Sequence, residues 1–141
     1  MEAAEKYKHS ECLTRKMRLR GKSAVKALFE SGTSFFQYPF KVVIGLDERK
    51  EIFPLRMLVS VSKRNFKNAS DRNKIKRQTR EAWRKQKGPL LDLLISTERR
   101  LNVGLIFTSK NILASSEINY KIKRILERLM HDYEIYKKPN G

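Results

Sequence analysis

The side chains best suited to bind a ligand lie between Ser70 and Arg84, where arginine, lysine and asparagine recur at helical spacing. At about 100° per residue, one stripe about 60° wide collects Asn73, Arg77, Arg80 and Arg84, with Lys74 and Lys76 beside it. A guanidinium group can bind a phosphate with two donors, so this stripe predicts contacts to the phosphates and sugar edges of a nucleic acid. The alternative is a solvated helix face, which is the usual explanation for a lone arginine but not for a whole row.

The opposite side of the same segment predicts how the stripe is held in place. Ile75, Thr79, Ala82 and Trp83 converge there and should dock on a sheet. We expect Ser70 to be the N-cap of this helix, since a serine at that position can accept from the first free N–H groups. Asp71 suits the positive end of the helix dipole, and Gly88-Pro89 closes the basic segment.

Residues for conventional protein catalysis do not gather in the sequence. His9 and His131 are far apart, and one cysteine gives no zinc-ligand spacing. The six glycines form neither a phosphate loop nor a dinucleotide fingerprint. The carboxylates of Asp47, Glu48 and Glu51 could in principle bind a metal for phosphodiester cleavage. They lie among basic residues in a predicted turn, which favours a solvated loop.

Composition restricts the class of protein. The chain has 141 residues, 40% of them hydrophobic, which is enough for one domain with a real core. No run approaches 18 apolar residues, and the N-terminus lacks the apolar stretch of a secretory signal. The single cysteine, Cys12, allows no internal disulfide. We therefore expect a cytoplasmic protein that does not enter a membrane.

The charge is concentrated in one segment. Lys and Arg total 32 and Asp and Glu total 15, so the net charge is +17. Residues 63–87 hold eleven basic and two acidic residues, which is more than half of that excess. The concentration favours a polyanionic partner over a merely solvated surface. A basic helix on a membrane surface is the other interpretation, but this segment lacks the broad Leu, Phe and Trp face that such a helix needs.

Hydrophobic patterns predict the elements that position these residues. Residues 22–31 have helical spacing, with Gly32 placed as a C-terminal cap. Residues 41–46, 55–62 and 102–108 are typical of strands, and residues 90–95 either extend the basic helix or form a short one. A last helix begins at Ser115 or Ser116. The order is helix, two or three strands, helix, strand, helix, in one α+β domain over residues 15–130, with tails at 1–14 and 131–141.

Several aromatic residues could pack in the core or stack on bases. Phe35, Phe36, Tyr38 and Phe40 cluster before the first strand. Unpaired RNA is commonly bound by stacking its bases on aromatic side chains in a basic groove. Aromatics that begin a strand are more often core, so we assign Phe40 and at least one of Phe35 and Phe36 to it, together with Trp83. For Phe29 the two interpretations are equally open.

A family resemblance rests on three stretches of sequence. Arg72-Asn73-Lys74-Ile75-Lys76-Arg77, followed by Arg80-Glu81, resembles the Arg-Asn-Arg signature helix of the protein subunit of bacterial ribonuclease P. That helix follows a strand ending Val-Ser-Lys-Lys in the family, and here Val61-Ser62-Lys63-Arg64 stands at the matching distance. Upstream, Leu28-Phe29 and Gly32-Thr33 are similar to the family's Phe and Gly-Thr/Ser segment. The resemblance covers residues 15–130.

The resemblance implies an activity and a set of partners. It implies a small central sheet with a left-handed βαβ crossover, in a protein subunit that promotes endonucleolytic removal of the 5′ leader from precursor tRNA. The catalyst would be the RNA subunit, with Mg²⁺ bound mainly there, so no residue of this chain is expected to be catalytic. The partners would be that RNA and precursor tRNA, with no membrane and no DNA.

Binding roles follow by matched position. The catalytic RNA would contact the signature helix through Arg72, Asn73, Lys74, Lys76, Arg77, Arg80 and Arg84. The single-stranded leader would contact Phe29, Lys63, Arg64 and Lys67. Lys74 replaces the second arginine of the signature, while Val25 and Val43 stand where relatives often have aromatics.

Three other functions compete with this one. A structural RNA-binding protein, such as a ribosomal protein, could share the size and charge of this chain. A stand-alone metal-dependent nuclease would cut RNA by itself. A DNA-binding factor is the weakest alternative, because no helix-turn-helix is evident.

Overall fold

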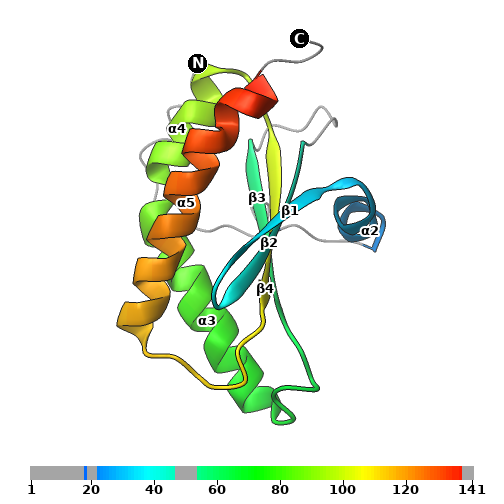
Figure 1. The fold of residues 1–141 in the computed structure, drawn as a ribbon, viewed down its shortest axis with the longest axis vertical. Coiled ribbons are helices and arrows are strands. Elements are labelled where there is room, and N and C mark those ends of the chain that lie inside the picture. The colour runs from blue at the N-terminus through cyan, green and yellow to red at the C-terminus, as the bar shows by residue number, and fades with distance from the viewer. Residues whose placement is uncertain (1–17, 19–21, 47–53, 138–141) are drawn as a thin grey trace.

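The computed structural model describes residues 18, 22–46 and 54–137 (Figure 1). The elements are, in chain order, α2 (Lys22–Ser31), β1 (Thr33–Gln37), β2 (Phe40–Leu46), β3 (Leu55–Val61), α3 (Ala69–Gln86), α4 (Gly88–Ser96), β4 (Leu101–Phe107) and α5 (Ser115–Lys137). The predicted α+β order is confirmed, with the segment before Phe40 forming its own strand.

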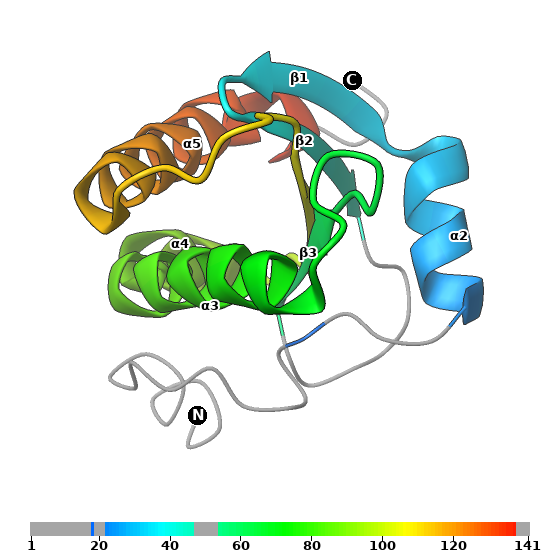
Figure 2. The same ribbon diagram turned by 90° about the horizontal axis from the view of Figure 1, so that it is seen from below.

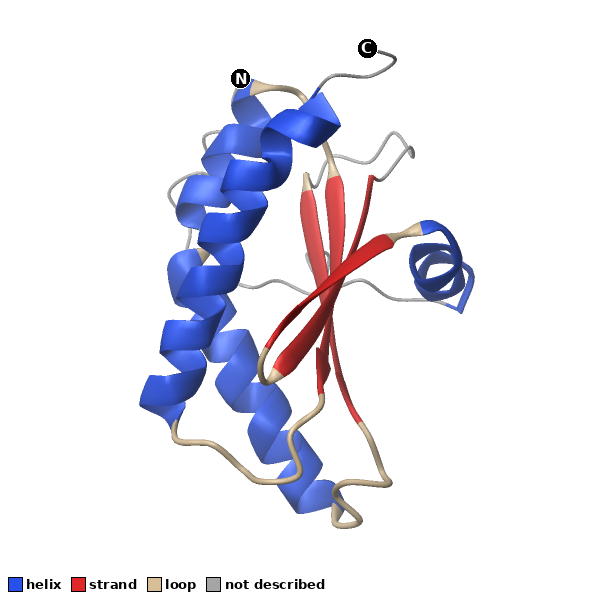
Figure 3. Ribbon diagram, viewed as in Figure 1, coloured by secondary structure: helices blue, strands red, loops and turns tan. Residues whose placement is uncertain are grey.

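Four strands form one mixed sheet in the order β1-β2-β4-β3 (Figure 3). β1 pairs with β2 and β2 with β4 in antiparallel fashion, whereas β3 and β4 are parallel. The chain joins these parallel strands through α3 and α4. In Figure 2 both strands point toward the viewer and the chain passes clockwise from β3 through the helices to β4, so the crossover is left-handed. Nearly all such connections are right-handed, which makes this topology distinctive.

Helices cover the two faces of the sheet unequally. α3, α4 and α5 lie on one face, and α2 lies alone on the other (Figure 2). Strand residues alternate between the faces. The main core lies under the three helices and includes Phe40, Val42, Met57, Leu105 and Phe107. A smaller cluster of Leu28 and Val43, with Val25, Leu58 and Ile106 beside it, lies under α2.

Glycines let α2 approach the sheet closely. A Cβ on Gly104 would lie 3.3 Å from Leu28 Cδ2, and one on Gly45 would lie 3.2 Å from Leu28 Cδ1. At the end of the helix the backbone N–H of Gly32 donates to the carbonyl of Leu28 at 2.9 Å, as expected of the predicted C-cap. The side chain of Leu28 therefore packs against both glycines and holds α2 close to the sheet.

Two predicted boundaries differ from the structure. Ser70 is not the N-cap of the basic helix, because α3 begins at Ala69 and its N-cap is Asn68, whose backbone is still extended at φ −80° and ψ 127°. α5 continues to Lys137, so residues 131–137 extend a helix beyond the domain end expected at 130. Residues 90–95 belong to a separate short helix, α4, which starts at Gly88-Pro89. The predicted tail at 1–14 and the turn at 47–50 lie outside the described residues.

Candidate nucleic-acid interface

Helix α3 has one buried side and one outward-facing side, as the sequence predicted. Ile75, Thr79, Ala82 and Trp83 are buried, with exposed fractions of 1% or less. The Thr79 hydroxyl is satisfied inside the helix, since Oγ1 donates to the carbonyl of Ile75 at 2.8 Å. Docking of this side orients the helix about its own axis. The opposite side, which carries the basic stripe, therefore faces outward.

The stripe is most open near the start of the helix. Asn73, Lys74 and Arg77 are exposed, whereas Lys76, Arg80 and Arg84 are half-buried. Burial lowers the pKa of the Arg80 guanidinium below its ordinary value, and the nearby charge of Arg18 lowers it further. Arg18 itself pairs with Met57 at the edge of β3. Two like charges held close together strengthen the attraction that this surface exerts on an anion.

An acidic residue interrupts the far end of the stripe, which the sequence reasoning overlooked. Arg84 donates to Glu81 from Nη2 to Oε1 at 2.6 Å and from Nε to Oε2 at 3.1 Å. Lys85 Nζ lies 3.7 Å from the same carboxylate. The hydrogen bond from Arg84 is the main cause that lowers the pKa of Glu81. The spacing of three and four residues could have revealed both pairs, because such side chains are neighbours on a helix.

Arg72 has a structural partner that the sequence did not reveal. Its Nη1 donates to the carbonyl of Phe66 at 2.7 Å and to that of Lys67 at 2.9 Å. The guanidinium therefore ties the first turn of α3 to the loop that precedes it. Arg72 acts as a positioning residue for this loop, whatever it contacts with its remaining donors.

The loop at residues 62–67 is fixed and presents its charges outward. The N–H of Phe66 donates to the carbonyl of Ser62 at 3.1 Å, and the N–H of Arg64 donates to Ser62 Oγ at 3.0 Å. The Phe66 ring is buried, with its centroid 6.0 Å from that of Phe107. The three predicted leader-binding cations of this loop are all exposed: Lys63, Arg64 and Lys67.

The structure decides most of the aromatic assignments. Phe40 and Trp83 are core residues, as predicted. Phe35 packs against the core, and the guanidinium of Arg128 lies 4.1 Å from its ring centroid, whereas Phe36 is 57% exposed. The assignment of at least one of this pair to the core is therefore confirmed. Phe29 is 41% exposed, which leaves part of its ring open to a ligand.

The predicted site residues fall into two groups on different sides of the molecule. The stripe lies on α3, on the face of the sheet that three helices cover (Figure 2). Phe29 lies on α2, on the other face. The loop after β3 lies at the end of the strands that faces the viewer in Figure 2 and reaches toward the side of α2. Arg72 connects this loop to the stripe, so the two groups are joined through one side chain.

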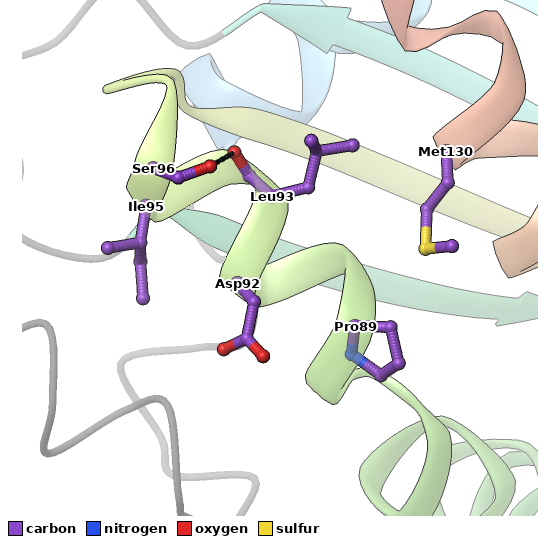
Figure 4. A pocket seen from close by; sticks show the side chains of 6 residues that line it. All are labelled: Pro89, Asp92, Leu93, Ile95, Ser96 and Met130. Carbon is purple, nitrogen blue, oxygen red and sulfur yellow. Dashed lines mark hydrogen bonds between the residues drawn. The ribbon is translucent and has the colours of Figure 1, made fainter.

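A hollow elsewhere on the molecule offers no competing site. Its volume is about 500 Å³, and it is lined by Pro89, Asp92, Leu93, Ile95 and Ser96 of α4 and by Met130 of α5 (Figure 4). Ser96 Oγ donates to the carbonyl of Leu93 at 3.0 Å, and one buried oxygen of Asp92 lacks a hydrogen-bond partner. Among the six described residues that line this hollow, Asp92 is the one titratable side chain.

The described residues, 18, 22–46 and 54–137, contain neither a metal-binding cluster nor a membrane-spanning helix. Within these ranges no three His, Cys, Asp or Glu side chains gather as a metal site would require. No helix in the same ranges is both long and apolar enough to cross a membrane. Asp47, Glu48 and Glu51, the carboxylates considered for a metal, fall in the undescribed segment 47–53.

Known proteins resemble this chain in sequence. The sequence model of the family described as Ribonuclease P matches residues 13–130. A ribonuclease P protein component from Porphyromonas gingivalis is 36% identical over 95 residues, which cover 67% of this chain and 68% of the relative. One from Chlorobaculum tepidum is 37% identical over 87 residues, covering 59% of this chain and 56% of the relative.

Solved structures share the fold. The ribonuclease P protein of Thermotoga maritima superimposes with a TM-score of 0.62 at 22% identity, covering 79% of this chain and 96% of the other. That of Staphylococcus aureus gives a TM-score of 0.59 at 24% identity, covering 79% and 94%. At these identities the likeness extends to the fold alone.

Proposed function

The chain belongs to the ribonuclease P protein family, and from that premise we propose that α3 binds the catalytic RNA while the face of the sheet that carries α2 binds the single-stranded 5′ leader of precursor tRNA. The protein would thereby promote endonucleolytic maturation of the 5′ end of tRNA. The names of the relatives support this function and not that of a ribosomal protein.

The orientation of α3 is the observation that carries the proposal. Trp83, Ile75 and Ala82 are buried in the core, so the opposite side of the helix faces outward, where it can contact a ligand. Arg77 is exposed in the middle of that side, with Asn73 one turn before it. A folded RNA offers phosphates and ribose hydroxyls, which guanidinium and amide groups bind well. Arg84 contributes less to RNA binding, because its charge is already paired with that of Glu81.

The leader site uses different chemistry. Phe29 supplies an exposed ring on which an unpaired base can stack. Lys63, Arg64 and Lys67 supply positive charge at the end of the strands for the phosphates of the same segment. A single-stranded leader presents both groups at once, whereas a duplex hides its base faces. This site should therefore bind precursor tRNA more tightly than mature tRNA, which has no leader.

The chemical step is assigned to the RNA subunit. The family resemblance supports this assignment, since it implies that the catalyst is the RNA subunit. We place the Mg²⁺ ions in the RNA, and the role of this chain is to bind and orient. The protein is then a subunit of an endoribonuclease without being its catalytic centre.

Reconstitution tests the proposal. The protein is mixed with a bacterial ribonuclease P RNA, precursor tRNA and subsaturating magnesium, and it should stimulate leader cleavage. Arg77→Ala with Arg80→Ala should weaken binding to the catalytic RNA and flatten the log–log salt dependence by about 0.9 for each lost phosphate contact. Lys85→Ala is the control, because it removes a charge from the same helix at a position already paired with Glu81. No stimulation, or an unchanged affinity and salt slope in the double variant, would contradict the proposal.

A further inference from the structure

Two exposed aromatic rings lie side by side on the hairpin between β1 and β2. Phe36 is 57% exposed and Tyr38 is 48% exposed. Their ring centroids are 6.4 Å apart and their planes are inclined by 54°. The core does not use these rings, unlike the neighbouring Phe35 and Phe40. Large aromatic side chains left together on a surface commonly mark a binding site.

Hydrogen bonds fix the tip of this hairpin. Tyr38 Oη donates to Ser109 Oγ at 3.3 Å, and Ser109 is itself buried. The backbone N–H and the hydroxyl of Thr108 both donate to the carbonyl of Pro39 at 2.8 Å. The Tyr38 ring and the backbone of the turn are therefore held by the segment that follows β4, so less conformational entropy is lost when a ligand binds there.

The strand register places the pair on the same face as α2. Phe36 stands opposite Lys41, and Lys41 stands opposite Ile106, which in turn stands opposite Ser60. Val43, two residues from Lys41 and hence on the same side of β2, packs against Leu28 of α2. The row from Phe36 to Ser60 spans three strand spacings, or about 14 Å. It runs from the aromatic pair toward the loop that carries the leader-binding cations.

Acidic residues are excluded from the segments that build this face. Residues 33–46, 55–70 and 101–116 contain no Asp or Glu. The same segments contain six cations, namely Lys41, Arg56, Lys63, Arg64, Lys67 and Lys110. Of these, Arg56 is buried and donates to Asn102, and the other five are exposed. Glu30 of α2 lies on this face as well, and Lys26 Nζ is 3.8 Å from its carboxylate. A surface with exposed rings and an excess of cations is complementary to a single-stranded nucleic acid, which has π-faces and phosphates.

From these observations we propose that Phe36 and Tyr38 form a base-stacking subsite for an unpaired nucleotide of the 5′ leader. The inference rests on the proposed leader site and extends it across the sheet. The leader runs from the cations of the 62–67 loop along the row of Ser60, Ile106 and Lys41 to the hairpin. Other RNA-binding domains also stack two or three bases on the face of a four-stranded sheet, which is an analogy in chemistry and not in topology.

The test uses the reconstituted holoenzyme and a series of precursor tRNAs whose leaders lengthen by one nucleotide at a time. Phe36→Ala should bind the longer leaders about tenfold more weakly than the wild type, because about that much affinity comes from one stacked base. Leaders too short to reach the hairpin should bind equally well to both. Phe36→Tyr should keep full affinity, whereas Phe36→Leu should not, since leucine retains apolar area without a ring face.

A fluorescent base supplies an independent readout. 2-Aminopurine placed at successive leader positions loses fluorescence when it stacks on a ring. One position should be quenched by the wild type and not by Phe36→Ala or Tyr38→Ala. Tyr120→Ala is the matched control, because that ring is 55% exposed on α5, beyond the other face of the sheet. Phe36→Ala should melt at the temperature of the wild type, since this ring does not belong to the core. Tyr38→Phe accompanies Tyr38→Ala, because Tyr38→Ala also removes the hydrogen bond to Ser109, whereas phenylalanine loses that bond but keeps the ring.

The outcomes separate this inference from the proposed function. Equal affinity of Phe36→Ala and wild type for every leader, with quenching unchanged, would remove the subsite and leave the leader site at Phe29 intact. Full affinity of Phe36→Leu would overturn stacking. A wild-type holoenzyme that binds precursor and mature tRNA equally would overturn the leader site as a whole, and the subsite with it.

Discussion

Replacement of Phe29 by alanine separates packing from ligand binding on α2. Phe29 is 41% exposed, so somewhat more than half of the residue's surface is covered. Burying a whole phenylalanine stabilises a protein by about 1.5–3 kcal/mol, which leaves about 1–2 kcal/mol for this partial burial. A fully buried ring would cost about 3–5 kcal/mol on truncation. We therefore expect Phe29→Ala to fold, with a modestly lower Tm.

The same substitution should weaken binding of the leader much more than it weakens the fold. Loss of one stacked base costs about 1–3 kcal/mol, or about five- to 150-fold in affinity. The loss should appear for precursor tRNA and not for mature tRNA, because only the precursor carries a leader. The measurement is the Kd of the reconstituted holoenzyme for each tRNA, and the quantity that should fall is the ratio between the two.

Phe29→Leu distinguishes the two roles of the ring. Leucine keeps most of the contact with the sheet and removes the π-face, so it should restore the Tm without restoring the preference for precursor. Equal losses of affinity for both tRNAs in folded Phe29→Ala would refute the reasoning and place Phe29 outside the leader site. A variant that fails to fold would show that the ring belongs to the core.

Three further substitutions test other parts of the structure. Arg72→Ala should speed amide exchange in residues 62–67 and weaken leader binding, because the loop loses two hydrogen bonds from one guanidinium. Glu81→Gln should tighten binding to the catalytic RNA, because it frees the charges of Arg84 and Lys85, whereas Glu127→Gln is the control and should not. The pKa of Glu81 is lowered, so its ion pair exists at neutral pH and is lost only as the pH falls through that lowered value. Gly32→Ala should destabilise the fold by about 1–3 kcal/mol in chemical denaturation, because its Cβ would meet the carbonyl oxygens of Leu28 and Ile44, while Gly88→Ala, with open space around it, should not.

Periodic features could be predicted from the sequence. The helix at 22–31 was predicted to the residue, and the apolar side of α3 was predicted because four residues at helical spacing had only one consistent interpretation. Strands rich in Val, Ile and Leu were found for the same reason. These features depend on neighbours within a few residues, and local sequence contains that information.

Contacts between segments could not be predicted in this way. Phe35 and Phe36 are adjacent and point to opposite faces of β1, and which of them is core depends on α5 covering one face. Asn68 is the N-cap instead of Ser70 because α3 begins at Ala69, two residues earlier than an N-cap at Ser70 predicts. Arg72 bonds a loop whose path is set by burial of Phe66. Each case requires knowledge of where a second segment lies.

The charge on the face of the sheet that carries α2 also depends on segments that are distant in the sequence. More than half of the excess charge in the sequence lies in residues 63–87, which contain the loop after β3 as well as α3. The sheet face receives Lys63, Arg64 and Lys67 from this segment, and it is positive also because three segments separated in the sequence lack acids and the strand order brings them together. A few cations then suffice, because these three segments contribute no opposing carboxylate. The protein thus presents a dense basic stripe suited to a folded RNA and a sparse, aromatic surface suited to an unpaired strand, and Arg72 links the positions of the two.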